Sequence, residues 1–146
     1  MKTTILTLLI AITLFFGCEK SSTVTIIEDG SYSGTLTIKN DINTYSETIP
    51  VTLSLEQGKF LISLSSNAKP TGGNGTFAIK DGVATFDDRN VWTADFDWSR
   101  ILNGDYDLEF GTGKLVLTKR LTPTHDAGPA THYTQISYQY VLTRDK

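Results

Sequence analysis

The stretch Val51-Thr-Leu-Ser-Leu-Glu-Gln-Gly-Lys-Phe-Leu-Ile-Ser-Leu64 decides the fold of this protein. Apolar residues recur at every second position on both sides of Gln57-Gly58, a pair typical of a two-residue β-turn. Such a turn sets Leu55 opposite Phe60 and places the alternating apolar residues of both strands on one face. The stretch therefore predicts a β-hairpin with one buried face.

The same pattern recurs along the chain. Asp81-Gly82 and Thr112-Gly113 are further turn pairs, and the first sets Phe77 opposite Phe86. With the alternation near both ends of the domain, these hairpins predict an all-β chain of about eight strands. The strands are expected near residues 31–39, 47–56, 59–65, 74–80, 83–87, 105–111, 114–120 and 133–143. Successive hairpins favour an antiparallel up-and-down β-barrel, with a β-sandwich as the alternative.

Two segments interrupt the alternation. Residues 88–104 include Trp92 and Trp98 but change parity before Ile101, which predicts an extended or singly turned segment covering an open end or side of the sheet. Residues 121–131 are rich in proline and glycine and predict an exposed loop.

Composition limits the classes of function. The chain has 146 residues, a formal charge of -3, one cysteine, 39% hydrophobic and 20% charged residues. This length fits one domain, and the composition is that of a globular chain rather than a disordered one. A single cysteine excludes an internal disulfide and a multi-cysteine zinc site. The mild negative charge argues against nucleic acid as a partner, since phosphate binding needs clustered basic residues.

The N-terminal residues have the pattern of a targeting signal. Lys2 precedes an apolar run over residues 5–16, which is shorter than the roughly 20 residues of a membrane-spanning helix and matches the core of a secretory signal. Gly17-Cys18 follows directly, and this arrangement resembles a bacterial lipobox, with Phe15 where the family favours leucine.

The lipobox resemblance implies that Cys18 is lipidated and becomes the mature N-terminus. Two or more acyl chains hold a protein stably on a bilayer. We therefore expect a signal peptide over residues 1–17, a tether over 18–29 and the barrel domain over 30–146. The expected location is the cell envelope, with the chain anchored through lipid to the outer membrane and the domain outside the cytoplasm.

The barrel domain also resembles a known family. Gly30-Ser31-Tyr32 opens the first strand as the glycine-x-tryptophan motif does in lipocalins, with tyrosine in place of tryptophan, and the basic Arg144 closes the last strand. The chain is similar to lipocalin-like lipoproteins of Gram-negative bacteria. The resemblance implies a small apolar ligand inside the barrel. A structural or protein-interaction lipoprotein with a filled core and no ligand is the alternative.

Aromatic side chains are the candidate ligand contacts. Four tyrosines fall on predicted apolar faces, where their hydroxyls need hydrogen-bond partners, and the 92–98 segment is a candidate lid. The expected ligand-binding residues are Tyr32, Trp92, Phe96, Trp98, Tyr106, Tyr138 and Tyr140. Core packing is the competing interpretation, because the predicted inward side chains are large and an eight-stranded barrel is narrow.

The sequence contains none of the common catalytic or phosphate-binding motifs, so we expect neither an enzyme nor a cofactor. The polar clusters are interpreted as solvated rather than as metal or catalytic sites, since no third rigid ligand and no calcium-loop pattern accompanies them. These clusters are His125 and His132 with Asp126, and the acidic pairs Asp87/Asp88, Asp95/Asp97 and Asp105/Asp107.

Overall fold

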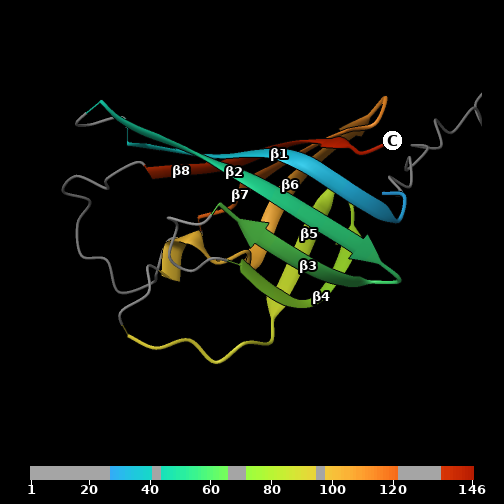
Figure 1. The fold of residues 1–146 in the computed structure, drawn as a ribbon, viewed down its shortest axis with the longest axis horizontal. Helices are drawn as coiled ribbons and strands as arrows, with labels where there is room; N and C mark the ends of the chain where they lie inside the picture. Colours follow the sequence, from blue (N-terminus) through green and yellow to red (C-terminus); the bar gives the residue numbers. More distant parts are fainter. Residues whose placement is uncertain (1–26, 41–43, 66–71, 95–97, 122–135) are drawn as a thin grey trace, which may run out of the picture.

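The structure is a computed structural model that describes residues 27–40, 44–65, 72–94, 98–121 and 136–146. Eight strands and one short 3-10 helix make up this part of the chain (Figure 1). Their bounds are β1 Gly30–Asn40, β2 Tyr45–Glu56, β3 Lys59–Leu64, β4 Gly72–Lys80, β5 Val83–Asp88, η1 Trp98–Arg100, β6 Gly104–Gly111, β7 Lys114–Lys119 and β8 Ile136–Arg144. Each expected strand is present, and residues 133–135 of the last expected strand lie outside the described residues.

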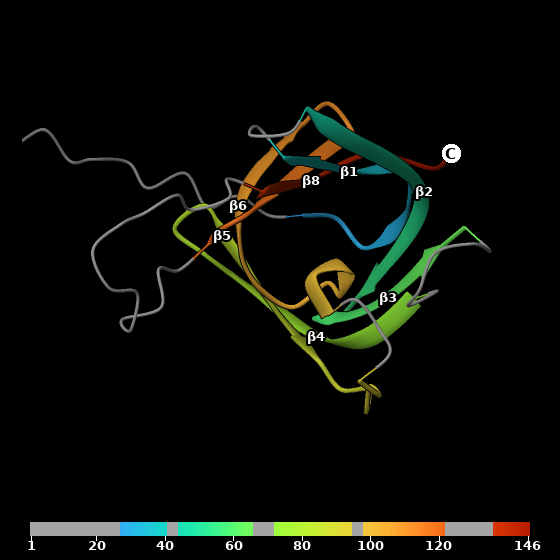
Figure 2. The same ribbon diagram turned by 90° about the vertical axis from the view of Figure 1, so that its left-hand side faces the viewer.

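The strands form a closed barrel in sequence order, with every neighbouring pair antiparallel. β1 pairs with β8, for example Leu36 with Tyr140, and this pairing closes the ring (Figure 2). The prediction of an up-and-down barrel is confirmed. The β-sandwich alternative is wrong, because two separate sheets would leave β1 and β8 as unpaired edges.

The predicted hairpin registers are confirmed. Leu55 pairs with Phe60 across Gln57-Gly58, and Phe77 pairs with Phe86 across Asp81-Gly82. Both central residues of the first turn have positive φ, 48° at Gln57 and 75° at Gly58, as a type I′ turn requires. The turn twist matches the twist of the flanking strands, so local chemistry fixes the register of the ladder.

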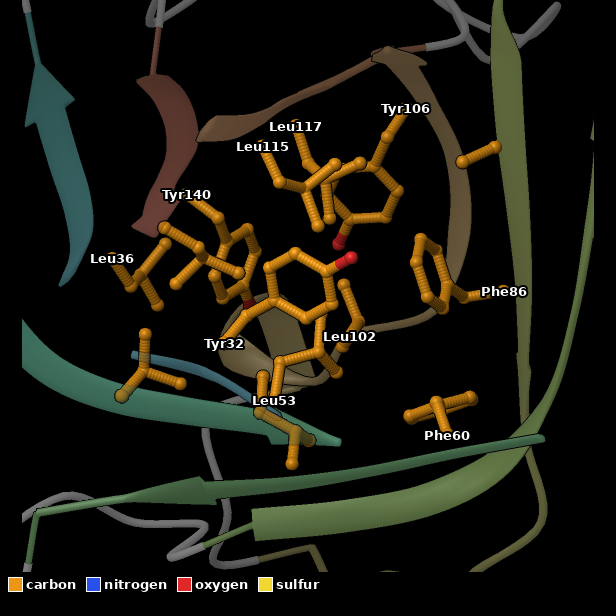
Figure 3. Packing of buried hydrophobic residues seen from close by; sticks show 14 of the residues in the cluster. Tyr32, Leu36, Leu53, Phe60, Phe86, Leu102, Tyr106, Leu115, Leu117 and Tyr140 are labelled. Atoms are coloured by element: carbon orange, nitrogen blue, oxygen red, sulfur yellow. The ribbon is translucent and has the colours of Figure 1, made fainter. Parts of the chain in front are cut away.

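The barrel interior is packed with apolar and aromatic side chains (Figure 3). An edge-to-face series of rings crosses it, from Phe60 to Phe86 at 5.2 Å, to Tyr106 at 5.6 Å and to Tyr140 at 6.0 Å between ring centres. In the described part of the chain, eleven large side chains are less than 2% exposed. They are Tyr32, Tyr106, Tyr140, Phe86, Leu36, Leu53, Leu55, Leu102, Leu115, Leu117 and Leu142.

The two ends of the barrel are built differently (Figure 1). At one end lie the three two-residue turns, the start of β1 and the end of β8. We call this the short-turn end. The strand ends that the longer connections join all lie at the other end, which we call the long-connection end. They are Asn40, Tyr45, Leu64, Gly72, Asp88, Gly104, Lys119 and Ile136.

The crossover from β5 to β6 covers the long-connection end. Its single helical turn, η1, lies within the ring of strands in Figure 2, and Leu102 directly after it is 1% exposed within the core. The alternation of apolar and polar residues breaks before Ile101, where the chain turns inward. Ile101 is itself buried. The expectation of a singly turned covering segment is confirmed for its described residues.

Candidate functional site

Three of the expected ligand contacts lie in the packed centre of the barrel. Tyr32, Tyr106 and Tyr140 are each at most 1% exposed, and Figure 3 shows their rings among the leucines of the core. The Tyr32 hydroxyl donates to the backbone carbonyl of Glu28 at 2.6 Å. These hydroxyls are satisfied inside the protein, so this part of the interior is organised by its own side chains.

Burial controls the ionisation of the central tyrosines. Desolvation is the largest cause that raises the pKa of Tyr106, and it also raises the pKa of Tyr140 well above its ordinary value. A hydrogen bond between these two hydroxyls raises the pKa of Tyr140 further and lowers that of Tyr106. Both side chains therefore act as neutral hydrogen-bonding groups near physiological pH.

Tyr138 lies with a lysine toward the long-connection end of the barrel. The Lys119 ammonium is 5.5 Å from the ring centre of Tyr138 and 5.9 Å from that of Tyr106, within the range of a cation–π contact. Lys119 falls on the same face of β7 as Leu115 and Leu117, so its half-buried side chain lies on the inner side. Lys119 is not among the site residues expected from the sequence. Its position two residues after Leu117 on an alternating strand already indicates that it faces inward.

The two tryptophans lie at one hollow beside the crossover. This hollow has a volume of about 140 Å³ and lies at the end of β5, beside η1. Trp92 is half-buried and Trp98 is 59% exposed. The residues that line the hollow are Asp88, Asn90, Trp92, Trp98, Ile101 and Asn103.

Asp88 is the polar centre of this hollow. Its Oδ1 accepts hydrogen bonds from the indole N–H of Trp92 at 2.8 Å and from the backbone N–H of Asn90 at 2.9 Å. The Asn103 side-chain oxygen accepts a hydrogen bond from the backbone N–H of Asp88 at 3.0 Å. The interpretation of Asp88 as a fully solvated acid is wrong, because it shares the inner face of β5 with Ala84 and Phe86 and is half-buried.

The other acidic pairs behave as expected where the structure describes them. Asp87 is exposed and pairs with Arg89. Asp105 is exposed and accepts a hydrogen bond from Thr85 at 2.7 Å, and Asp107 is exposed and pairs with Arg120. These side chains belong to the solvated outer face of the barrel.

A charged pair fixes η1 to the strands. Arg100 donates two parallel hydrogen bonds to the Glu47 carboxylate, at 3.1 and 2.8 Å. The side chains are only 20% and 32% exposed. The Tyr45 hydroxyl donates to the same carboxylate at 2.6 Å, and this bond raises the pKa of Tyr45. The hydrogen bonds of Arg100 and Tyr45 to Glu47 therefore hold η1 against the start of β2.

Several residues that the sequence analysis singles out lie outside the described residues. They are the lipidation site Cys18, the ligand contact Phe96, the pair Asp95/Asp97, and the group His125, Asp126 and His132. Within the described ranges, no group of three or more histidine, cysteine, aspartate or glutamate side chains is placed to hold a metal ion. In the same part of the chain, no helix has the length and apolarity needed to cross a membrane.

No protein-family model, curated protein or solved structure matches this chain. The assignment of the fold therefore depends on the strand register and the ring closure. The assignment of the site depends on the geometry at the long-connection end.

Proposed function

We propose that the protein is a lipid-anchored lipoprotein of the Gram-negative cell envelope, with a lipocalin-like barrel that binds a small apolar ligand and performs no catalysis. The anchor is the thioether-linked lipid on Cys18, and the domain lies outside the cytoplasm on the outer membrane. The closed eight-strand barrel supports the lipocalin-like part of this proposal.

The observation that carries the proposal is the difference between the two ends of the barrel. The described chain enters at the short-turn end, where Ile27 is buried and Arg144 binds both Glu28 and the carbonyl of Asp29. A tether from Cys18 to this end directs the long-connection end away from the membrane. Loops at one end of a rigid barrel are the usual place for binding.

The side chains at the long-connection end favour a ligand that is mostly apolar and carries one polar group. Tyr138 is 8% exposed, and it lies with Lys119 above the apolar centre of the barrel. An apolar body would pack against the inner leucines, and a polar group would meet the tyrosine and lysine side chains. Eight-stranded barrels have room for one small ligand at most.

A second candidate function is protein interaction by a barrel with a filled core. The fully buried central tyrosines favour it, and so do the exposed apolar side chains. Among the described residues, four of the five exposed large hydrophobic side chains lie at the long-connection end. They are Tyr45, Val91, Trp98 and Leu121, whereas Leu61 lies on the outer face of β3.

Uptake of the apolar fluorophore N-phenyl-1-naphthylamine by the purified protein separates the two candidates. The ligand-binding function predicts saturable fluorescence at one site per chain. The fluorescence should weaken several-fold in Tyr138→Ala and stay unchanged in the control Leu61→Ala, whose side chain lies on the outer face. Absence of saturable binding, with no lipid-sized adduct in the native mass spectrum, would instead support the filled-core candidate.

The anchor is tested separately by fractionation. We expect wild-type protein in the membrane fraction, and Cys18→Ser in the soluble fraction with its signal uncleaved by the lipoprotein signal peptidase. Ser21→Ala is the matched control and should behave as the wild type does. Continued membrane attachment and normal processing of Cys18→Ser would refute lipidation at that residue.

A further inference from the structure

The hollow beside the crossover has a chemistry that the barrel interior lacks. The packed core cluster consists of hydrophobic and tyrosine side chains, whereas the hollow combines two indoles and one isoleucine with a carboxylate and two carboxamides. Its volume of about 140 Å³ is close to that of a cavity that accepts one six-membered ring. It is well below the roughly 300 Å³ at which pockets for drug-sized ligands begin.

The polar groups of the hollow are held in place by bonds within the protein. Asn90 fixes the Asp88 carboxylate, with its side-chain nitrogen 3.1 Å from Oδ2 and its backbone N–H on Oδ1. Asn90 is itself bound to Asn74 on β4. The Asn103 oxygen accepts the backbone N–H of Asp88, and this contact orients the Asn103 amide nitrogen.

Asp88 offers a hydrogen-bond acceptor to a ligand, and Asn103 offers a hydrogen-bond donor beside it. An ionised carboxylate only accepts hydrogen bonds, and a carboxamide nitrogen only donates them. A hydroxyl does both, so two neighbouring hydroxyls of one ligand can donate to Asp88 and accept from Asn103. The exposed indole of Trp98 adds a flat apolar surface next to them.

We propose that this hollow binds a single neutral pyranose ring, such as the terminal residue of a glycan. The C–H face of the ring stacks on Trp98, and neighbouring hydroxyls bridge Asp88 and Asn103. The site lies outside the packed core, so it does not depend on ligand binding inside the barrel. It gives the long-connection end a binding function of its own.

A quaternary ammonium group is the chemical competitor, since it also binds between aromatic rings beside a carboxylate. It forms no hydrogen bonds, however, and would make no use of the Asn103 amide. The charge of Asp88 is also shared with N–H donors from Asn90 and Trp92. The lining therefore favours a neutral polyol ring over a cation.

Saturation-transfer NMR on the full chain tests the site. The probes are the methyl glycosides of glucose, galactose, mannose and N-acetylglucosamine, with choline as the competing cation. We expect transfer to the ring protons of at least one glycoside. Trp98→Ala and Asn103→Ala should each weaken that binding about three- to tenfold, as expected for loss of one aromatic or hydrogen-bond contact. Val91→Ala is the control, because Val91 is 97% exposed and lies outside the lining.

Three results would overturn the site. These are no transfer to any of the four glycosides, binding of choline in their place, or wild-type glycoside affinity in Trp98→Ala. Trp98 and Asn103 are both exposed, so thermal melting should show that the variants stay folded. Naphthylamine uptake by the same variants should match the wild type, which separates failure of this site from failure of the barrel function.

Discussion

Tyr32 on β1 and Arg144 on β8 are direct cross-strand partners, and both bind the segment that leads into the barrel. The Tyr32 hydroxyl donates to the carbonyl of Glu28 at 2.6 Å, and an Arg144 Nη donates to the carbonyl of Asp29 at 2.8 Å. Burial raises the pKa of Tyr32, while the Arg144 charge lowers it. The closing pair of the barrel thus also fastens residues 28 and 29, which lead into β1.

Loss of these contacts should destabilise the barrel measurably. Tyr32→Phe leaves the Glu28 carbonyl without its partner, at a cost of about 1 kcal/mol in the free energy of unfolding. Arg144→Met removes a charge-assisted hydrogen bond, at a cost of about 1–2 kcal/mol, because the exposed ion pair with Glu28 adds little. Chemical denaturation of the purified protein measures both.

Arg120→Met is the control for Arg144→Met. Arg120 also forms an ion pair, with Asp107, but on the outer face with both side chains about half exposed. Its removal should cost clearly less in the free energy of unfolding than the removal of Arg144, because an ion pair between exposed side chains adds little. Equal losses for the two arginine variants would mean that Arg144 is only a surface charge.

A second prediction concerns a close approach between the backbones of β1 and β8 at Gly34. Gly34 lies between Tyr32 and Leu36 on the inner face, and a Cβ atom there would lie 2.0 Å from the carbonyl oxygen of Val141. The clash is with backbone, so relief requires movement of β8. Gly34→Ala should therefore lower the free energy of unfolding by about 1–3 kcal/mol or more.

Gly111→Ala is the matched glycine control. Gly111 ends β6, and a Cβ atom there meets no atom within 4 Å. Thermal unfolding of the two variants under the same conditions should show a large loss only for Gly34→Ala. A comparable loss for Gly111→Ala would point to a general effect of replacing strand glycines instead of a clash.

The barrel itself could be predicted because its determinants are local. Strand alternation and the turn pairs at Gln57, Asp81 and Thr112 set the inward face and the register of three hairpins without knowledge of the rest. Gly72 and Gly73 lie outside the expected strand 74–80, because glycine carries no alternation signal, yet they pair with β3 as the start of β4.

The site was only partly predictable. Strand parity places Asp88 beside Phe86 and Lys119 beside Leu117 on the inner face, but a charged residue at a strand end is usually assigned to solvent. The contact of Arg100 with Glu47 joins residues 53 positions apart through a crossover that has no periodic pattern. Such a contact depends on tertiary structure and leaves no local trace in the sequence.

A third prediction follows from the raised pKa values of Tyr106 and Tyr140. Below the ordinary tyrosine pKa of about 10, both groups are neutral in the folded and unfolded chains, and the stability linked to them is complete. As the pH rises above that value, the unfolded chain loses these protons first. Stability should therefore fall progressively from about pH 10 upward.

Tyrosinate absorbance during an alkaline titration measures this directly. Tyr140→Phe should remove one late-ionising group and reduce the slope of stability against pH above about pH 10. Leu61→Ala is the control, since this exposed side chain on the outer face of β3 carries no ionisable group and its loss should leave the slope unchanged. Ionisation of Tyr106 and Tyr140 at the ordinary pH while the protein stays folded would contradict their burial in the core.

A fourth prediction concerns the pair that holds η1 in the barrel end. The two hydrogen bonds of Arg100 to Glu47 are sheltered, with side chains 20% and 32% exposed, so their coupling should exceed that of a surface pair. A double-mutant cycle with Arg100→Ala and Glu47→Gln should give a coupling of about 1 kcal/mol. The exposed pair Arg89–Asp87, with side chains 66% and 57% exposed, should give a coupling near zero.

Hydrogen exchange locates the effect of that coupling in the structure. The Ile101 amide donates to the carbonyl of Trp98 at 3.3 Å and closes the turn that Arg100 anchors. Arg100→Ala should speed exchange of this amide, while the Leu108 amide, which binds Gly82 at the opposite end, should exchange as in the wild type. Equal acceleration at both amides would mean that the pair stabilises the whole barrel, and no acceleration at Ile101 would mean that η1 is held by the burial of Leu102 alone.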